Sequence, residues 1–498
     1  MGFLKSRVFR FIASLGLAAI FYFLCPPCFS KMYLGGVLLL LVLIINLPKI
    51  FGYKWLTHLT RIAVGGLFIF SGFIKANDPV GFSIKLNEYF EIFEQGFSCD
   101  MQVAAKKSEI PCQEEVDKRI AAEKLQKEED AKRAANPNYV TPPPPAPKVS
   151  AFKPLWEFCS EHSLFLAIFI CGFEMAVGIF LLLGLKVRWT LFLLLAMIVF
   201  FAFLTFYSAC CNKVNSCGCF GDAIKLTPWE SFWKDLILLI LIAVLFVGEQ
   251  HIKPPFKNTI VIAGIAGIGL FGSFAFPVYT MRHLPVIDFR PYAIGTNLWE
   301  ASQNKSPKTT GCKPDSVIIT YYYQNSKTGK IIHFRSTSDT MNTVLDDSLM
   351  NYYCRDMQLI SKGNCAATVL DFGITDLESG EMLTDSLLKM KGVEFLLIMH
   401  DMDLAERSAM PVINTFYDAC AKAHTPFFAL TNGSYEQDEA FKKETGAKYP
   451  ICSVDGTALK TVIRSNPGLV MLKDGVVIAK WHFNDFPAYS EAMKKAQP

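Results

Sequence analysis

The chain has little net charge for its length. Its 498 residues carry 49 Lys and Arg against 45 Asp and Glu, a formal net charge of +4. Proteins that bind nucleic acid through phosphates concentrate positive charge on one face, and so small a balance indicates neither nucleic acid nor an acidic partner. We therefore expect no nucleic-acid-binding function.

A small-residue cleavage site is also missing from the amino-terminal region. Residues 8–24 are apolar and follow Lys5, Arg7 and Arg10, which is how a secretory signal begins, but the run ends at the CPPC sequence of residues 25–28. We interpret the run as a retained transmembrane helix.

Long apolar runs are abundant instead, because 51% of the residues are hydrophobic and 42 are Phe. This composition is too apolar for a purely soluble protein, so part of the chain lies in the lipid bilayer. About seven runs approach the length needed to cross it. They are residues 8–24, 34–50, 62–74, 162–185, 189–207, 236–247 with its flanks, and 258–276.

Basic residues orient these spans. Those beside the helix ends fall on one side of the predicted topology, which the positive-inside rule makes cytoplasmic. They are Lys5, Arg7, Arg10, Lys49, Lys54, Arg61, Lys186, Arg188, Lys253 and Lys257. We expect a bacterial inner-membrane protein with a cytoplasmic amino terminus and a periplasmic C-terminal half. Of the 15 cysteines, only Cys171 then lies within a span, a distribution that disulfides in an oxidising compartment would explain.

Four cysteines gather between two of the apolar runs, Cys210, Cys211, Cys217 and Cys219. Such density indicates thiol–disulfide chemistry or a metal. The paired C-x2-C knuckles of zinc sites are absent, so we predict no metal. A bridge within the C-G-C sequence would be strained and labile, whereas bridges to Cys210 or Cys211 would make the loop a static framework.

Cys25 and Cys28 present the same choice at the end of the first span. Their spacing is that of redox pairs, and a structural staple at a helix end is the alternative. We take both cysteine clusters as candidate catalytic thiols.

Three segments resemble parts of the DoxX/MauE-like membrane proteins of Bacteroidetes, and they occur in the order of that family. They are RIAVGGLFIFSGFIKANDP at residues 61–79, FEMAVGIFLLLGLKVR at residues 173–188 and CGCFGDAIKLTPWESFWKD at residues 217–235. The resemblance covers roughly the first half of the chain. It implies a helical membrane protein linked to redox and disulfide biogenesis outside the cytoplasm. It also matches Glu174 to the membrane glutamate of the family.

Glu174 lies in the middle of an apolar span, where an ionisable group is a functional hypothesis by default. The alternative is a packed polar contact, with the group protonated or paired with Lys75 or Arg61. Aromatic residues that lead into the cysteine loop could wall a quinone-like ring, although such a stripe also serves helix packing or an interface belt. They are Phe201, Phe203, Phe206 and Tyr207.

An insert at residues 81–154 is expected to lie apart from the membrane core. Its residues 113–135 alternate in charge at helical spacing with almost no apolar stripe, which predicts a solvated helix. Residues 141–149 are a polyproline spacer. Cys99 and Cys112 flank the base of the insert and are candidates for a structural disulfide.

Residues 283–392 are predicted to be rich in short strands, beginning with SVIITYYYQ and KIIHFRS. Cys312, Cys354 and Cys365 permit one bridge and a leftover thiol, with Cys354 and Cys365 as the candidate pair.

The last hundred residues alternate strands and helices, with Pro411 inside a predicted helix at 404–423 and Pro467 directly before a strand. This order resembles a thioredoxin fold, but the position of its CxxC motif is occupied by residues 403–406, DLAE. Without thiols there, the domain cannot itself exchange disulfides. The resemblance implies that Pro467 keeps a peptide-binding edge, and Cys420 and Cys452 are expected to be bystanders.

These features predict five regions: residues 1–80 with three spans, the insert 81–160, residues 161–280 with four spans and the cysteine loop, the exported β-rich segment 281–392, and an α/β thioredoxin-like domain at 393–498. The favoured function is membrane-linked thiol–disulfide exchange or electron transfer, with quinone as a possible cofactor and an exported protein as a possible client. The alternative is a non-catalytic scaffold or biogenesis factor with structural disulfides and a protein-binding C-terminal domain.

Overall fold

A computed structural model describes residues 54–94, 152–211, 214, 218, 220–303, 312–313, 316–325, 331–335, 350–361, 367–369 and 372–497, without the side chains of Cys211 and of the strands within 316–361 other than Tyr323. The chain divides into two compact units. Of the described residues, those within 54–94, 152–302 and 369–497 belong to one unit and those within 303–368 to the other.

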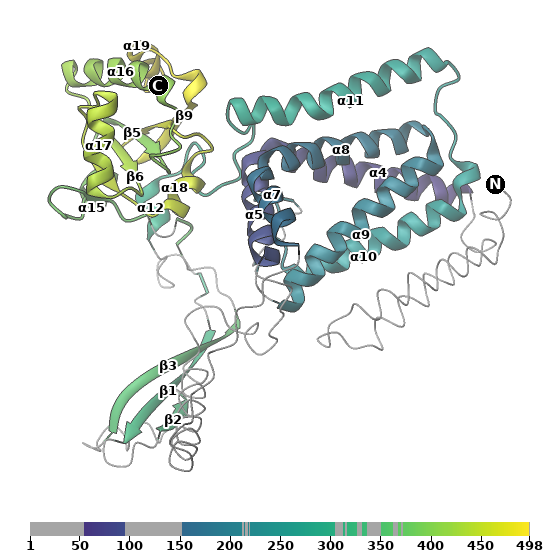
Figure 1. Cartoon of the computed structure of the whole chain (residues 1–498), viewed down its shortest axis with the longest axis horizontal. Coiled ribbons are helices and arrows are strands. Elements are labelled where there is room, and N and C mark those ends of the chain that lie inside the picture. Colours follow the sequence, from purple (N-terminus) through teal and green to yellow (C-terminus); the bar gives the residue numbers. More distant parts are fainter. Residues whose placement is uncertain are drawn as a thin grey trace, which may run out of the picture. The chain divides into compact units, whose positions relative to one another are not determined.

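The first unit contains a helical bundle organised on two antiparallel helices, α4 (Lys54–Asn77) and α8 (Ser163–Leu183) (Figure 1). Glycines bring them together: a Cβ on Gly72 would lie 2.7 Å from Met175 Cγ, and one on Gly178 would lie 2.8 Å from Ile69 Cγ1. Small residues let helix backbones approach closely in lipid, where no hydrophobic effect drives helices together. The contact explains why a glycine-containing sequence forms this helix pair.

Two further helices complete the core of the bundle, α9 (Val187–Cys211) and α10 (Pro228–Val247). Helix α10 begins with a capping box in which Thr227 Oγ1 accepts from Glu230 N and the Glu230 carboxylate accepts from Thr227 N. Glu230, Lys234 and Asp235 occupy its first two turns. The apolar remainder, residues 236–247, would span only about 18 Å of a hydrocarbon core that is about 30 Å thick.

Four described helices are long and apolar enough to cross a membrane, namely α4, α8, residues 187–210 of α9, and α11 (Thr259–Arg282). The predicted spans at 62–74, 162–185, 189–207 and 258–276 coincide with them. The span predicted at 236–247 is helical but is not among the four. Helix α11 packs on α8 and leaves Ile268 and Phe271 each 76% exposed, as expected for a face that contacts lipid.

The bundle extends beyond the predicted boundary at residue 80. Helix α5 (Pro79–Glu94) and the short α7 (Lys153–Glu161) pack together, and α5 also packs on α8. Helix α5 buries a stripe at helical spacing, Phe82, Leu86, Tyr89, Phe90 and Phe93. The first part of the insert therefore belongs with the membrane helices, because its apolar stripe needs a partner surface.

The second unit contains a three-stranded antiparallel sheet with the order β2-β1-β3. Its strands are β1 (Ser316–Asn325), β2 (Ile331–Arg335) and β3 (Met350–Ser361). The first two are the predicted SVIITYYYQ and KIIHFRS strands. Tyr322 pairs with Cys354, next to a register shift at Tyr323.

The C-terminal part of the first unit is built on a six-stranded mixed sheet with the order β4-β7-β6-β5-β8-β9. Its strands are β4 (Thr375–Asp376), β5 (Val393–Met399), β6 (Phe427–Thr431), β7 (Ile451–Ser453), β8 (Gly468–Lys473) and β9 (Val476–His482). Strand β5 is parallel to β6 and antiparallel to β8. Alternate residues of the buried β5 face two cores, Phe395 and Leu397 on one side and Leu396 and Ile398 on the other.

Helices and 3-10 turns surround this sheet. They are α12 (Leu298–Ser302), α15 (Thr384–Leu388), η3 (Arg407–Ala409), α16 (Met410–Lys422), α17 (Tyr435–Thr445), α18 (Gly456–Val462), η4 (Phe483–Asp485) and α19 (Tyr489–Lys494), whereas η2 (Glu249–His251) follows α10 and packs on α4 in the bundle. The helix predicted at 404–423 begins only at Met410. Pro411 therefore stands in its first turn, where a missing N–H costs nothing, and not inside the helix.

Residues 403–406 form a closed turn before α16. Asp401 Oδ1 accepts from the amides of Asp403 and Leu404, and Arg407 donates to the carbonyls of Met402 and Ala405. An Asp at the start of a turn commonly makes such bonds.

Several predictions fall on residues outside those described. They are the first two spans, Cys25, Cys28, Cys99, Cys112, Cys217, Cys219, Cys365, the solvated helix at 113–135 and the polyproline spacer.

Candidate functional site

An ion pair lies inside the bundle between α4 and α8. Lys75 Nζ and Glu174 Oε2 are 2.5 Å apart, and their side chains are 2% and 4% exposed. A single charge at this depth would be costly in lipid, whereas a paired lysine and glutamate present no net charge. The structure thus gives Glu174 the partner Lys75 and not Arg61.

Lys75 also contacts two aromatic rings. Its Nζ lies 4.5 Å from the centre of the Phe201 ring and 5.6 Å from that of Phe82. The face of an aromatic ring carries partial negative charge, so both rings attract the side-chain cation. The cation is therefore held by α5 and α9 as well as by Glu174.

A second buried carboxylate, Asp235 on α10, lies near this pair. It is fully buried, accepts a hydrogen bond of 3.0 Å from Thr205 Oγ1, and contacts Lys234 Nζ at 2.7 Å. None of these three residues was predicted to be functional. The predicted span begins at Leu236, directly after Lys234 and Asp235, and Thr205 lies within the apolar run 189–207. A charged pair directly before an apolar run inside one helix was the available signal.

A small cavity joins the two carboxylates. Its lining includes Lys75, Glu174, Phe201, Lys234 and Asp235. A second cavity shares Lys75 and Phe201 and reaches Thr205 and Tyr89. Each has room for little more than a water molecule, so neither holds a quinone ring in this conformation. Water beside two carboxylates and two amines could carry a proton between them.

The aromatic residues expected to wall a ring do not share one pocket. Phe201 is buried against Lys75, Phe206 packs on Phe232 with ring centres 5.1 Å apart, and Tyr207 packs on Phe93 at 5.3 Å. Phe203 is 43% exposed. Phe203 and Tyr207 lie four positions apart on one face of α9, with ring centres 6.5 Å apart, whereas Phe201 faces Lys75. These residues serve mainly helix packing.

Arg61 has a separate role at the other end of α4. Its guanidinium donates to the carbonyls of Leu181 and Leu182, at the end of α8, and to the carbonyl of Lys253. The last carbonyls of a helix have no partner within the helix, and a cation there also complements the helix dipole. Arg61 thus ties three segments together.

The cysteine loop joins α9 to α10, whose first turns carry Asp235. Cys210, in the last turn of α9, is buried and disulfide-bonded, and the other sulfur is not among the described side chains. Cys312 is also disulfide-bonded, and its partner sulfur likewise does not belong to a described side chain. Cys211 and Cys354 are placed in α9 and β3 by their backbones only.

Four described cysteines are free thiols, Cys159, Cys171, Cys420 and Cys452. In the C-terminal sheet domain, burial raises the pKa of Cys420 to about 12 and that of Cys452 to about 11. Thiolate is the reactive form, so both are poor nucleophiles at neutral pH.

The segment at Pro467 is closed by the turn at 403–406. The peptide bond between Asn466 and Pro467 is cis. The Asn466 carbonyl accepts from Glu406 N, and Asn466 Nδ2 donates to the Asp401 carbonyl at 2.6 Å. The carbonyl that precedes the proline, which a bound peptide strand would need, already has a partner.

Metal ligands do not gather in the part of the chain that the structure describes. Nowhere in these ranges do three or more His, Cys, Asp or Glu side chains stand close enough to hold an ion.

Together, the apolar helices and the buried ion pair define a multi-pass helical membrane protein. Residues 147–248 match the family model described as methylamine utilisation protein MauE. The match contains α8, α9, the cysteine loop and α10, and it indicates a membrane-associated role in a redox-related process. No curated protein and no solved structure matches the chain significantly.

Proposed function

We propose that this protein exchanges electrons between thiol pairs at the exported face of a bacterial inner membrane. The observation that carries the proposal is the match to the MauE model over residues 147–248, which contain four closely spaced cysteines between the apolar helices α9 and α10. Cys25 and Cys28, at the end of the first predicted span, form the second pair. A dithiol that becomes a disulfide releases two electrons and two protons, and a lipid-soluble quinone that becomes a quinol would accept them.

The buried charges support this proposal, because electron transfer from thiols also moves protons. Asp235 lies on α10, which the cysteine loop enters, and the cavity connects it with the Lys75–Glu174 pair. Carboxylates in a membrane interior are typical of proton relays. We assign Glu174 and Asp235 the role of holding and passing protons.

We infer that the C-terminal sheet domain is thioredoxin-like but does not take part in the exchange. The order β6-β5-β8-β9, with α16 between β5 and β6 and a cis proline before β8, supports the likeness. Residues 403–406 contain no thiol, and Cys420 and Cys452 are buried in the cores of the sheet. The domain is therefore better suited to binding a partner.

The alternative function is a membrane scaffold with structural disulfides. The small size of both cavities favours it, because no described pocket admits a quinone without movement of Phe201 or its neighbours. In this alternative the Lys75–Glu174 pair is a packing element only.

A mixed disulfide distinguishes the two functions. Attack of one thiolate on the other pair joins the two clusters through one sulfur of each, and removal of the resolving thiol traps that bond. We expect Cys28→Ser or Cys219→Ser to give a bridge between the first span and the central loop, detectable by mass spectrometry after alkylation. Cys171→Ser is the matched control, because this thiol is free and fully buried in α8, and it should trap nothing. Absence of the bridge, together with unchanged function in all single variants, would leave the scaffold alternative.

A further inference from the structure

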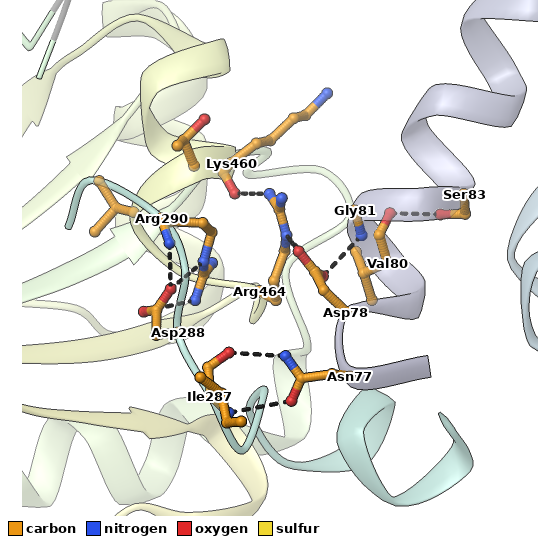
Figure 2. A network of polar contacts seen from close by, with 12 residues as sticks. Asn77, Asp78, Val80, Gly81, Ser83, Ile287, Asp288, Arg290, Lys460 and Arg464 are labelled. Carbon is orange, nitrogen blue, oxygen red and sulfur yellow. Dashed lines mark hydrogen bonds and ion pairs between the residues drawn. The ribbon is translucent and has the colours of Figure 1, made fainter. Parts of the chain in front are cut away.

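The joint between α4 and α5 is bonded to the C-terminal sheet domain, and both belong to one compact unit. Arg464 Nε donates to both oxygens of Asp78, each at 3.0 Å. The Arg464 side chain is only 9% exposed and that of Asp78 21%. Figure 2 shows this contact between residues that are 386 positions apart in the sequence.

A second contact lies one residue away. The Asn77 side chain is 1% exposed, donates to the Ile287 carbonyl at 2.7 Å, and accepts from Ile287 N at 3.1 Å (Figure 2). The next residue, Asp288, binds Arg290 at 2.7 Å and Lys480 of β9 at 2.9 Å. The segment after α11 is therefore fixed to the bundle on one side and to the sheet on the other.

Asp78 is also the residue on which the joint itself is built. Its N–H donates to the Lys75 carbonyl at 3.1 Å, and its Oδ1 accepts from Gly81 N at 2.9 Å, which caps the start of α5. Lys75 lies on the last turn of α4, and its ammonium faces Phe82 on α5. A contact that fixes the position of Asp78 therefore also fixes the angle between α4 and α5, the two helices beside Lys75.

We propose that Arg464, three residues before the cis proline, docks the C-terminal domain on the chain's own membrane bundle and positions the α4–α5 joint. This inference deepens the proposed partner-binding role of the domain and rests on it. The partner is the joint at Asn77 and Asp78, and not an exported peptide. Two observations favour it: the Asn466 carbonyl is already bonded within the domain, and Arg464 is directed to the bundle.

Hydrogen exchange of the full chain in detergent micelles tests the docking. Asp78→Asn keeps an oxygen that can cap α5 but removes the charge that attracts Arg464. We expect exchange in peptides covering residues 284–290 and 460–467 to become faster by about tenfold, as loss of one charge-assisted hydrogen bond implies. The substitution and the second peptide are far apart in sequence, so a local loss of helix structure would not produce this result.

Two more comparisons complete the test. Arg464→Leu combined with Asp78→Asn should exchange no faster than the faster single variant, because both remove the same bond. Gly81→Ala should mimic the effect, since its Cβ would clash with Asp78 Oδ2, would lie 2.8 Å from Arg464 Nη2, and would disturb the contact between them. Gly66→Ala is the matched control, because no atom beyond its chain neighbours and the backbone of its own helix lies within 4 Å of the added Cβ.

Unchanged exchange in residues 460–467 of Asp78→Asn, or additive effects in the double variant, would overturn the docking inference. The thiol-exchange proposal has a separate outcome, because the trapped disulfide does not depend on Arg464.

Discussion

Two buried carboxylates of the membrane bundle have charged or polar partners, whereas one buried carboxyl of the C-terminal sheet domain, that of Glu394, has none among the described residues. In the bundle, Glu174 is paired with Lys75, and Asp235 has Thr205 and Lys234 as partners. In the sheet domain, Glu394 on β5 is 1% exposed, and neither of its carboxyl oxygens has a hydrogen-bond partner among the described residues. Burial raises the pKa of Glu394 to about 8.

The difference shows what each surrounding permits. The sheet domain can keep one carboxyl neutral at neutral pH, since a protonated carboxyl costs far less to bury than a carboxylate. The bundle places two carboxylates beside two amines and a cavity, and a proton that moves from an amine to the carboxylate paired with it leaves no net charge behind. Chemistry is therefore more easily supported in the bundle.

Breaking the bundle pair should have the largest effect on stability. Glu174→Leu leaves Lys75 buried without its partner, and we expect a loss of about 3–5 kcal/mol in unfolding free energy. Adding Lys75→Met should recover most of it, because the double variant contains neither charge. Titration of the purified protein with SDS in mixed micelles measures both.

The matched control is Lys85→Met on α5. Lys85 pairs with Glu88 at 2.7 Å, but the two side chains are 33% and 40% exposed, so a loss below about 1 kcal/mol is expected. Equal losses at Lys85 and Glu174 would remove the contrast between buried and surface pairs.

The unpartnered Glu394 should have a smaller effect that depends on pH. Its folded pKa of about 8 exceeds the ordinary 4.5, so the folded state binds the extra proton between these values. The stabilisation is complete below about pH 4.5 and is lost as pH rises towards 8, by at most about 1.4 kcal/mol per pH unit.

Glu394→Gln removes this dependence. Calorimetry of the full chain from pH 5 to pH 9 should show the variant gaining on the wild type as pH rises. His400 and His482, whose pKa values burial lowers to about 4, contribute a slope of opposite sign to both proteins, so the difference isolates Glu394. Glu439→Gln, at a side chain that is 54% exposed, is the control. Parallel curves for wild type and Glu394→Gln would contradict the assignment.

The sequence predicted the positions of α4, α8, α9 and α11, because their apolar runs are long and bounded by charged residues. It also predicted that Glu174 is either a functional group within the membrane or a paired one, with Lys75 as one of two candidate partners. It could not choose between Lys75 and Arg61, because that choice depends on the antiparallel register of α4 and α8. The contact between Asp78 and Arg464 could not be predicted, since Asp78 stood out only as part of the family-like segment 61–79 and nothing near Arg464 indicated a partner in the bundle.

The smallest expected effect concerns the two free cysteines of the sheet domain. Cys420 and Cys452 are fully buried and free, and their raised pKa values leave a thiolate fraction at pH 7.5 of roughly one part in several thousand or less. We expect Cys420→Ala and Cys452→Ala to leave thiol–disulfide exchange by the full chain unchanged, and to lower its stability by only about 1 kcal/mol through lost packing. In the wild type, both thiols should resist alkylation at pH 7.5 until urea unfolds the sheet domain. Rapid alkylation of Cys452 in the native protein, or slower exchange in either alanine variant, would show that the sheet domain contains reactive thiols. The proposal that thiol exchange is confined to the membrane region would then be wrong.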